Sequence, residues 1–365
     1  MKTAKSKLIV IAAGGTGGHI FPALSVALQF KKDCAGVSLL WIGTDRSREV
    51  ELCVRHEIPI ILIAVTGIER KPSLKAAKSL LQFIGGFIKS FFLFLKDKPT
   101  AIVAFGGYVC APVLAAARLL SVRYFIHEQN TVPGLVNRLF SAHAQKVFAG
   151  LPFIDAKRLD GIVETIGTPV RQREETYEGF SYPSGFDRRK ETILICGGSQ
   201  GAQSMNECLK EPVRRWAMKG YQVVWQTGEP GYRDVLASVK SLSDVFVNAT
   251  IDDVYPFYAA SQVVVGRAGA STIAEIAYFG LPCVLIPLPW AADNHQWTNA
   301  GVVEGQGWGV CVKQDTFCRD KVDTAVMKIL TDKHLRETMK EKARAQTPSA
   351  AAQTIVRKVM EAITL

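Results

Sequence analysis

The 365-residue sequence predicts an α/β fold of two Rossmann-like domains whose parallel sheets face each other across a cleft. Three observations lead to this prediction. Buried, β-rich runs alternate with helix-length segments along the chain, which is typical of βαβ units and a parallel sheet. The chain length fits two domains better than one. Each half also opens with a strand, a glycine loop and a helix, at residues 8–19 and 192–202.

In the first half, short apolar runs predict strands and the segments between them predict helices. The predicted strands are residues 7–13, 38–42, 60–64, 101–105, 124–127 and 146–149, and the predicted helices are 22–30, 46–56 and 112–120. The first run follows a basic N-terminus, as a signal peptide does. It is too short for the apolar part of a signal peptide and ends at two glycines, so a strand explains it better.

The same scheme restarts near residue 192. The predicted strands are residues 192–196, 222–226, 245–249, 263–265 and 283–286, and the predicted helices are 203–219 and 271–279. A stretch rich in charge, Gly and Pro between residues 150 and 190 predicts the boundary, so we assign 1–165 and 166–348 to the two domains. The last helix, within 349–365, follows Pro348 and is expected to pack on either domain, the N-terminal one being the first choice.

The two glycine loops are candidate anion-binding sites. A strand that ends in Gly-Gly before a helix leaves unpaired backbone N–H groups at the helix N-terminus, where the helix dipole favours an anion. Either loop alone is equally consistent with tight-turn packing, but the recurrence of the loop in both halves favours phosphate binding. Neither loop has the Lys-Ser/Thr ending of a Walker A motif, and residues 14–19 fit GxGxxG poorly, so ATP hydrolysis and nicotinamide binding are disfavoured.

The net charge of +11, from 44 basic and 33 acidic residues, favours an anionic partner. Residues 69–98 contain seven basic and two acidic side chains, so part of this charge is concentrated. The eight cysteines form no CxxC pair, which excludes a readable zinc knuckle or thioredoxin-type site. No nucleic-acid recognition motif accompanies the lysines.

Residues 80–95 form a strongly apolar run inside this basic region. The run has 16 residues, fewer than the roughly 20 that a spanning helix needs, so we do not expect it to span a bilayer. It is expected to lie on an anionic membrane surface, or else to be an unusually apolar core helix, and Gly85-Gly86 predicts a break into two short helices. The candidate membrane residues are Leu80, Ile84, Phe87, Phe91, Lys75, Lys78 and Lys89.

Seven short motifs occur in the order typical of one enzyme family: GGTGGH at 14–19, FGGY at 105–108, HEQN at 127–130, TPVR at 168–171, GGSQG at 197–201, IDD at 251–253 and RAGASTIAE at 267–275. Together they resemble glycosyltransferase family 28, the bacterial N-acetylglucosaminyltransferases of peptidoglycan synthesis. The resemblance runs from about residue 8 to 300. It implies the GT-B fold, with an N-terminal acceptor- and membrane-binding domain and a C-terminal donor-binding domain.

The resemblance also implies the reaction. N-acetylglucosamine passes with inversion from UDP-N-acetylglucosamine to the muramoyl 4-hydroxyl of undecaprenyl-pyrophosphoryl-MurNAc-pentapeptide (lipid I), which gives lipid II and UDP. No metal or other cofactor is obligatory. The implied location is peripheral, on the cytoplasmic face of the bacterial inner membrane, with the anionic membrane surface and other cell-wall synthesis and division proteins as partners.

Family positions map onto a set of donor-binding residues, which are Thr16, Gly17, Gly18, Asn130, Arg171, Ser199, Gln200, Ile251, Ala270, Ser271, Thr272, Ile273, Ala274, Glu275 and Gln296. Ser199 with its neighbours is expected to hold the diphosphate, and Arg171 to offset the charge on departing UDP. Glu275 suits the two ribose hydroxyls. Residues 288–295 carry one extra residue relative to the family pattern, which weakens the assignment of Gln296 to the sugar hydroxyls.

On the acceptor side, the expected contacts are Gly14, Gly15 and Tyr108. His19 is the first candidate for the general base because an unperturbed histidine is largely neutral at pH 7. His127 and Glu128 are the rival candidates, and a cap or phosphate contact is the alternative role for His19.

Two other function classes stay open from the residues. One is a different GT-B enzyme that uses a UDP-sugar, such as a glycolipid glycosyltransferase or a non-hydrolysing UDP-N-acetylglucosamine epimerase, which needs an acidic catalytic cluster but no membrane surface. The other is a non-catalytic nucleotide-sugar or lipid-diphosphate binding protein, which can lose His19 and Asn130. Both residues are present here.

Overall fold

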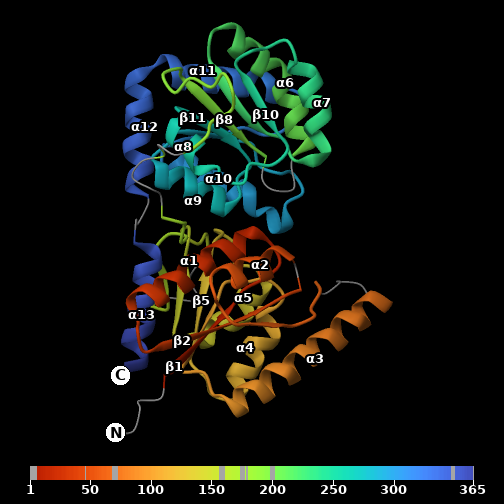
Figure 1. Cartoon of the computed structure of the whole chain (residues 1–365), viewed down its shortest axis with the longest axis vertical. Coiled ribbons are helices and arrows are strands. Elements are labelled where there is room, and N and C mark those ends of the chain that lie inside the picture. The colour runs from red at the N-terminus through yellow and green to blue at the C-terminus, as the bar shows by residue number, and fades with distance from the viewer. Residues whose placement is uncertain are drawn as a thin grey trace. The chain divides into compact units, whose positions relative to one another are not determined.

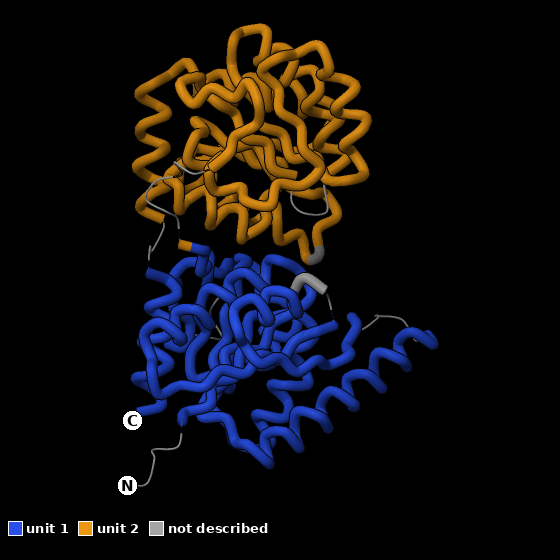
Figure 2. Tube along the Cα trace, viewed as in Figure 1, with its two compact units in different colours: residues 1–171, 350–365 blue, residues 172–349 orange. Residues whose placement is uncertain are grey.

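The computed structural model describes residues 6–45, 47–67, 73–155, 161–172, 177, 180–197, 202–346 and 350–364. The chain divides into two compact units (Figure 2). Unit 1 comprises residues 1–171 and 350–365, and unit 2 comprises 172–349. The C-terminal helix therefore belongs to the unit that contains the N-terminus.

Unit 1 is built on a seven-stranded parallel sheet with the order β3-β2-β1-β4-β5-β6-β7 (Figure 1). Its strands are β1 (Lys7–Ala12), β2 (Val37–Gly43), β3 (Ile60–Leu62), β4 (Ala101–Ala104), β5 (Tyr124–Glu128), β6 (Lys146–Ala149) and β7 (Val163–Thr165). The last four residues of β1 and all four residues of β4 are apolar and buried because helices cover both faces of the sheet.

The helices of unit 1 form two layers. They are α1 (Gly17–Asp33), α2 (Ser47–Arg55), α3 (Leu74–Lys96), α4 (Cys110–Leu119), α5 (Leu135–Phe140) and α13 (Ala351–Thr364), with a 3₁₀ turn at Ser141–His143. Alternate residues of β1 point to opposite layers: Ile9 and Ile11 pack with α1 and α13, whereas Val10 and Ala12 pack with α4. Both faces are thus fully buried.

Unit 2 repeats the arrangement with a six-stranded parallel sheet of order β10-β9-β8-β11-β12-β13. Its strands are β8 (Thr192–Cys196), β9 (Gln222–Gln226), β10 (Val245–Asn248), β11 (Val263–Gly266), β12 (Cys283–Leu285) and β13 (Gly309–Cys311). Its helices are α6 (Gln203–Met218), α7 (Glu229–Val239), α8 (Tyr255–Ala260), α9 (Ala270–Phe279), α10 (His295–Gly305), α11 (Cys318–Thr331) and α12 (Lys333–Ala345), with a 3₁₀ turn at Ala292–Asn294.

These two sheets confirm the predicted α/β fold of two Rossmann-like domains. Strands β7 and β13, which have three residues each and lie at sheet edges, were not predicted from the sequence. The predicted break at Gly85-Gly86 was wrong, because α3 runs unbroken from Leu74 to Lys96. Gly86 lies in the contact with α4, where a Cβ would come within 2.5 Å of Ile63 and 3.2 Å of Pro112. Tertiary packing therefore outweighs the low helix propensity of glycine.

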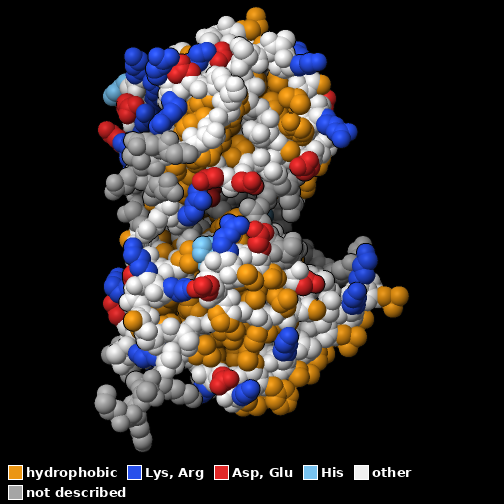
Figure 3. Space-filling model, in the orientation of Figure 1, with side chains coloured by type: hydrophobic (Ala, Val, Ile, Leu, Met, Phe, Trp, Pro, Cys, Tyr) orange, Lys and Arg blue, Asp and Glu red, His pale blue; other side chains and the backbone are white. Residues whose placement is uncertain are grey.

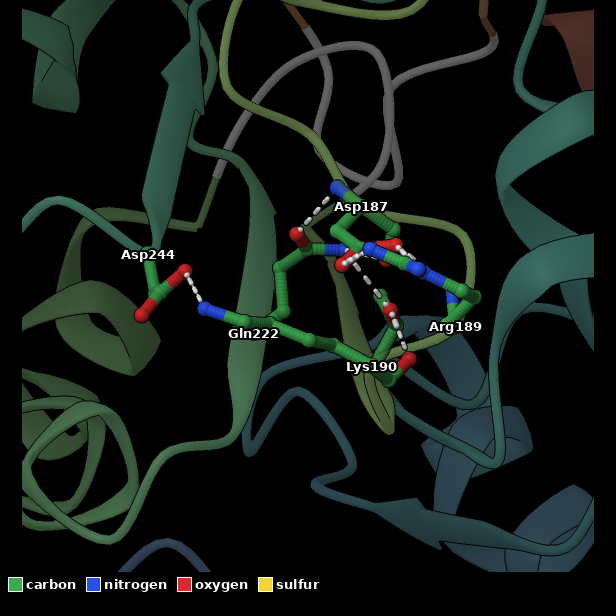
Figure 4. Close-up of polar contacts among 6 residues, drawn as sticks. Asp187, Arg189, Lys190, Gln222 and Asp244 are labelled. Carbon is green, nitrogen blue, oxygen red and sulfur yellow. Dashed lines mark hydrogen bonds and ion pairs between the residues drawn. The ribbon is translucent and has the colours of Figure 1, made fainter.

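A polar network fastens the segment before β8 to the amino-terminal edge of the unit 2 sheet (Figure 4). The buried Gln222 amide accepts a hydrogen bond from Asp187 N at 2.9 Å and donates to Thr192 Oγ1 at 3.0 Å. Lys190 pairs with Asp244 at 2.7 Å. The hydrogen bonds from Arg189 lower the pKa of Asp187 to about 2. This basic segment thus has local partners at the edge opposite to the glycine loops.

Helix α3 is 23 residues long, longer than the 16-residue run that the sequence suggested. By length and composition alone, it is the one helix in the described part of the chain that could cross a membrane, a criterion that core helices also meet. One side of α3 is buried, including Ser79, Ser90 and Phe94, and the helix packs along α4. Figure 1 shows the N-terminal end of α3 extending beyond the rest of unit 1.

Some apolar side chains of α3 are exposed to solvent, and others pack against the core of unit 1. Exposed on its outer side are Leu80, Leu81, Ile84, Ile88, Phe92 and Leu95. Phe87 and Phe91 are instead partly buried against the core, so they are weaker candidates for a membrane surface than their neighbours. Lys75, Lys78 and Lys89 are exposed, and the Lys89 ammonium donates to the Leu62 carbonyl at 2.9 Å.

The adjacent glycines of α3 give a matched stability test. Gly86→Ala should lower the free energy of unfolding by about 1 kcal/mol or more, because the added methyl group overpacks the contact with Ile63. Gly85→Ala meets open space and should raise it by about 0.5–1 kcal/mol through helix propensity. Urea unfolding of both variants measures the difference. Equal effects at the two positions would contradict the packing of α3.

Candidate functional site

In unit 1, the loop after β1 lies at the carboxyl edge of the sheet and leads directly into α1. Gly15 adopts a φ of +99°, a conformation that favours glycine, and Thr16 is the N-cap of α1 with extended backbone. The Thr16 side chain makes no cap hydrogen bond, and α1 has no acidic residue in its first turn. The positive end of the helix dipole therefore lies at this edge without an acidic side chain, as a site for an anion requires.

His19 lies in the first turn of α1, against the second glycine loop of this unit. Its Nδ1 is 3.4 Å from Thr16 Oγ1. A Cβ on Gly106 would lie 3.2 Å from the imidazole ring, and one on Gly107 would lie 2.5 Å from the Gly14 carbonyl oxygen. Both glycines have positive φ. Only a loop without side chains at these two positions lets the histidine and both loops pack together.

The environment of His19 keeps the imidazole neutral. Burial lowers its pKa from the usual value, while the Glu128 carboxylate and a hydrogen bond to the Gly14 carbonyl act in the opposite direction. A neutral imidazole can accept a proton at pH 7. The side chain is half-buried rather than enclosed, so a ligand can reach it.

Glu128, at the end of β5, is almost completely buried, and both of its carboxylate oxygens accept hydrogen bonds. Oε1 accepts from the backbone N and the Nδ2 of Asn130 at 3.0 and 3.1 Å. Oε2 accepts from Gly134 N at 2.9 Å and from Asn137 Nδ2 at 2.8 Å. Four donors on one carboxylate order the loop between β5 and α5 and orient the Asn130 amide, and they leave Glu128 poorly placed to accept a substrate proton.

His127 is fully buried in β5, and its Nε2 donates to the Gly167 carbonyl at 3.1 Å. Nδ1 is then the acceptor nitrogen, and it has no partner within the described residues. Desolvation lowers the pKa of His127 to about 4. The side chain is therefore neutral at pH 7, but its burial makes it a weaker base candidate than His19.

Two further expected residues of unit 1 lie on its surface. Tyr108 is 54% exposed, and its ring packs over Gly67. Arg171 is exposed and is the last residue of unit 1 along the main segment of the chain.

In unit 2, the corresponding glycine loop follows β8 and precedes α6. Gly198, Ser199 and Gln200, the expected diphosphate contacts, lie outside the described residues. Gly197 is described, and a Cβ there would come within 3.2 Å of Ala202 N. Helix α6 begins without an acidic residue in its first turn, so this N-terminus also suits an anion.

Helix α9 supplies the next part of the unit 2 site. It begins after the extended Gly269 and contains the expected residues Ala270 to Glu275, again with no acidic residue in the first turn. The buried Tyr258 hydroxyl donates to Glu275 Oε2 at 3.2 Å, which orients the carboxylate. Burial, together with the nearby Cys196 and Glu275, raises the pKa of Tyr258, so its proton stays on the hydroxyl.

The other expected donor contacts also lie at the carboxyl edge of this sheet. Gln296 is in the first turn of α10, and its Oε1 accepts from Leu288 N at 3.0 Å, which fixes the side chain beneath the 288–295 loop. That loop contains Asp293 and Asn294 at positive φ. Ile251 follows β10 and is half-buried.

Two residues that the sequence analysis did not assign belong to these sites. Asn137 anchors Glu128 in unit 1, and no motif indicated it. Arg267 lies within the RAGASTIAE motif of unit 2 and is buried at the end of β11. In the described part of the chain, no group of three or more His, Cys, Asp or Glu side chains is placed to hold a metal ion.

Comparisons with known proteins give consistent matches over both units. The family model described as the glycosyltransferase family 28 N-terminal domain matches residues 9–149, and that of the family 28 C-terminal domain matches 192–355. The UDP-N-acetylglucosamine--N-acetylmuramyl-(pentapeptide) pyrophosphoryl-undecaprenol N-acetylglucosamine transferase of Bacillus licheniformis is 36% identical over 352 residues, 94% of this chain and 95% of that protein. The protein of the same name from Listeria welshimeri is 34% identical, over 95% of this chain and 97% of its own length.

Solved structures show the same architecture. The crystal structure of Acinetobacter baumannii MurG matches with a TM-score of 0.75 and 28% identity, covering 97% of this chain and 99% of that one. A UDP-N-acetylglucosamine 2-epimerase matches with a TM-score of 0.68, 96% coverage of this chain and 95% of its own. At 17% identity, the second likeness concerns the fold alone.

The buried His127 predicts a pH dependence of stability. A histidine with a pKa of about 4 in the folded chain and about 6.5 when unfolded stabilises the fold fully above pH 6.5. That contribution, about 3 kcal/mol, is lost as the pH falls from 6.5 towards 4. Urea unfolding between pH 4 and 7 should show the loss, and His127→Gln should flatten it. An unchanged slope in the variant would contradict the neutral, buried imidazole.

Proposed function

The chain belongs to glycosyltransferase family 28, and we propose that it transfers N-acetylglucosamine from UDP-N-acetylglucosamine to the muramoyl 4-hydroxyl of lipid I. The products are lipid II and UDP, and the reaction is a step of peptidoglycan synthesis. The observation that carries this proposal is the 36% identity to a transferase of this name over nearly the whole of both chains. The site geometry of each unit agrees with it.

The acceptor chemistry is assigned to unit 1. The neutral His19 takes the proton of the 4-hydroxyl while that oxygen attacks the anomeric carbon of the donor sugar. The bond from the anomeric carbon to the diphosphate oxygen breaks, UDP leaves, and His19 later releases the proton to solvent. Glu128 stabilises the imidazolium that forms, and it orients Asn130 for a contact with the transferred sugar.

The donor chemistry is assigned to unit 2. The N–H groups at the start of α6 and α9 bind the diphosphate, and Glu275 accepts hydrogen bonds from the two ribose hydroxyls. Ile251 lies against the uracil. Arg171 then offsets charge on the departing UDP, and no step of this scheme requires a metal ion.

The lipid acceptor requires contact with a membrane, and α3 is the proposed surface. Exposed leucine, isoleucine and phenylalanine side chains run along its outer side. Figure 3 shows hydrophobic side chains where α3 extends from unit 1, with basic side chains beside them. Because the opposite side of α3 packs on unit 1, we propose a shallow, peripheral contact with the anionic cytoplasmic leaflet rather than a span.

The most direct test of the reaction is transfer of labelled N-acetylglucosamine to a short-chain lipid I analogue in the presence of EDTA. We expect a labelled disaccharide product at the rate seen without EDTA. Loss of activity with EDTA would contradict the metal-independent scheme. Release of UDP or of a sugar epimer without an acceptor would contradict the transferase assignment.

His19→Ala should lower kcat by about 100-fold or more and change the KM for UDP-N-acetylglucosamine little, since the group acts on the acceptor proton. The acid limb of the kcat/KM profile should lie below pH 6.5, because the pKa of His19 is lowered in the free protein. His143→Ala, which changes an exposed histidine of the same unit, is the control. Near-normal kcat in His19→Ala would exclude this residue as the base.

Replacing the exposed Leu81 and Phe92 with Ser should weaken co-sedimentation with vesicles containing anionic lipid, without lowering Tm. Met218→Ser, which removes an 81%-exposed apolar side chain of α6 in unit 2, is the matched control and should leave binding unchanged. Unchanged vesicle binding in the α3 variant would contradict the proposed membrane surface.

A further inference from the structure

Arg267 is a buried arginine at the carboxyl end of β11, and every partner of its guanidinium within the described residues is an uncharged acceptor. Nη1 donates to the Ile286 carbonyl at 2.9 Å, the Pro287 carbonyl at 3.3 Å and Gln314 Oε1 at 2.7 Å. Nη2 donates to Ser204 Oγ at 3.1 Å. The residue is 7% exposed, and Nε has no partner within the described residues.

No carboxylate of the described residues pairs with Arg267, which is unusual for so buried a charge. Arg336, the comparable buried arginine of unit 2, pairs with Glu191 at 2.6 Å. Burial lowers the pKa of Arg267 to about 10, which still leaves it charged at pH 7. The thiols of Cys318 and Cys208 act in the direction that raises the pKa of Arg267. A buried charge is costly without a counter-charge, so a ligand is a natural source of one.

The position of Arg267 shows which ligand group would supply that counter-charge. Its bonds reach the loops after β12 and β13 and the first turn of α6. Two residues later its own chain reaches Gly269, the N-cap of α9. The guanidinium therefore lies among the loops at the carboxyl edge of the sheet, beside the two helix N-termini that suit an anion.

We infer that Arg267 is a positioning residue whose uncompensated positive charge selects the diphosphate of the donor nucleotide. This inference deepens the proposed function and rests on it. Arg267 holds the first turn of α6 through its hydrogen bond to Ser204. Its charge also adds to the positive electrostatic potential at the two helix N-termini. Its contribution to binding should therefore grow with the number of phosphates on the nucleoside.

Gln314→Glu tests the charge with little change in shape. The new carboxylate would replace an amide oxygen 2.7 Å from Arg267 Nη1, so it keeps the hydrogen bond and supplies the counter-charge from the protein. We expect the Kd for UDP to rise about tenfold or more, the Kd for UMP to rise less, and the Kd for uridine to stay the same. Tm should be unchanged or higher. Isothermal titration with the three ligands measures the effect.

Gln314→Met is the matched control, because it removes the hydrogen bond without adding charge. Its preference for UDP over uridine, measured as the ratio of the two Kd values, should stay near that of the wild type. Arg267→Met removes the charge by a second route and should lower the same preference even if it also lowers Tm. An unchanged preference in Gln314→Glu, or equal losses for UDP and uridine, would overturn the inference and leave Arg267 a purely structural residue. A wild-type chain that binds neither UDP nor uridine would instead overturn the proposed function.

Discussion

The parallel sheets constrain everything else in this protein, because they place every strand's carboxyl end and the following helix N-terminus at one edge. At that edge, backbone N–H groups are left without helical partners. In unit 1 the glycines at 14, 106 and 107 let two such loops approach each other and His19. Side chains at these positions would separate the loops, and the histidine would lose its position.

Each unit has a buried charged side chain at its site, Glu128 in unit 1 and Arg267 in unit 2, and the two differ in their hydrogen-bond partners. In unit 1 the Glu128 carboxylate accepts four hydrogen bonds, so its charge orders a loop and acts on His19 without being available to substrate. In unit 2 the Arg267 guanidinium donates to neutral acceptors among the described residues, and we infer that its charge acts on a ligand. The first arrangement suits proton transfer at a neutral imidazole, and the second suits an anionic nucleotide.

Patterns that depend on neighbours in sequence could be read before the structure was known. Most strands follow from short apolar runs, and both glycine loops and the start of α6 follow from Gly-Gly at the end of such a run. Tertiary contacts could not be read in this way. The continuity of α3 through Gly85-Gly86 depends on Ile63 and Pro112, and the saturation of Glu128 depends on Asn137. The burial of Arg267 without a carboxylate likewise depends on loops that are distant in sequence.

A crystal structure of the chain with UDP is the measurement that tests this account most directly. The diphosphate should lie at the N-termini of α6 and α9, both ribose hydroxyls should contact Glu275, and the Arg267 guanidinium should keep its uncharged protein partners. A nucleotide bound at the glycine loops of unit 1, or a diphosphate that contacts neither helix N-terminus of unit 2, would contradict it.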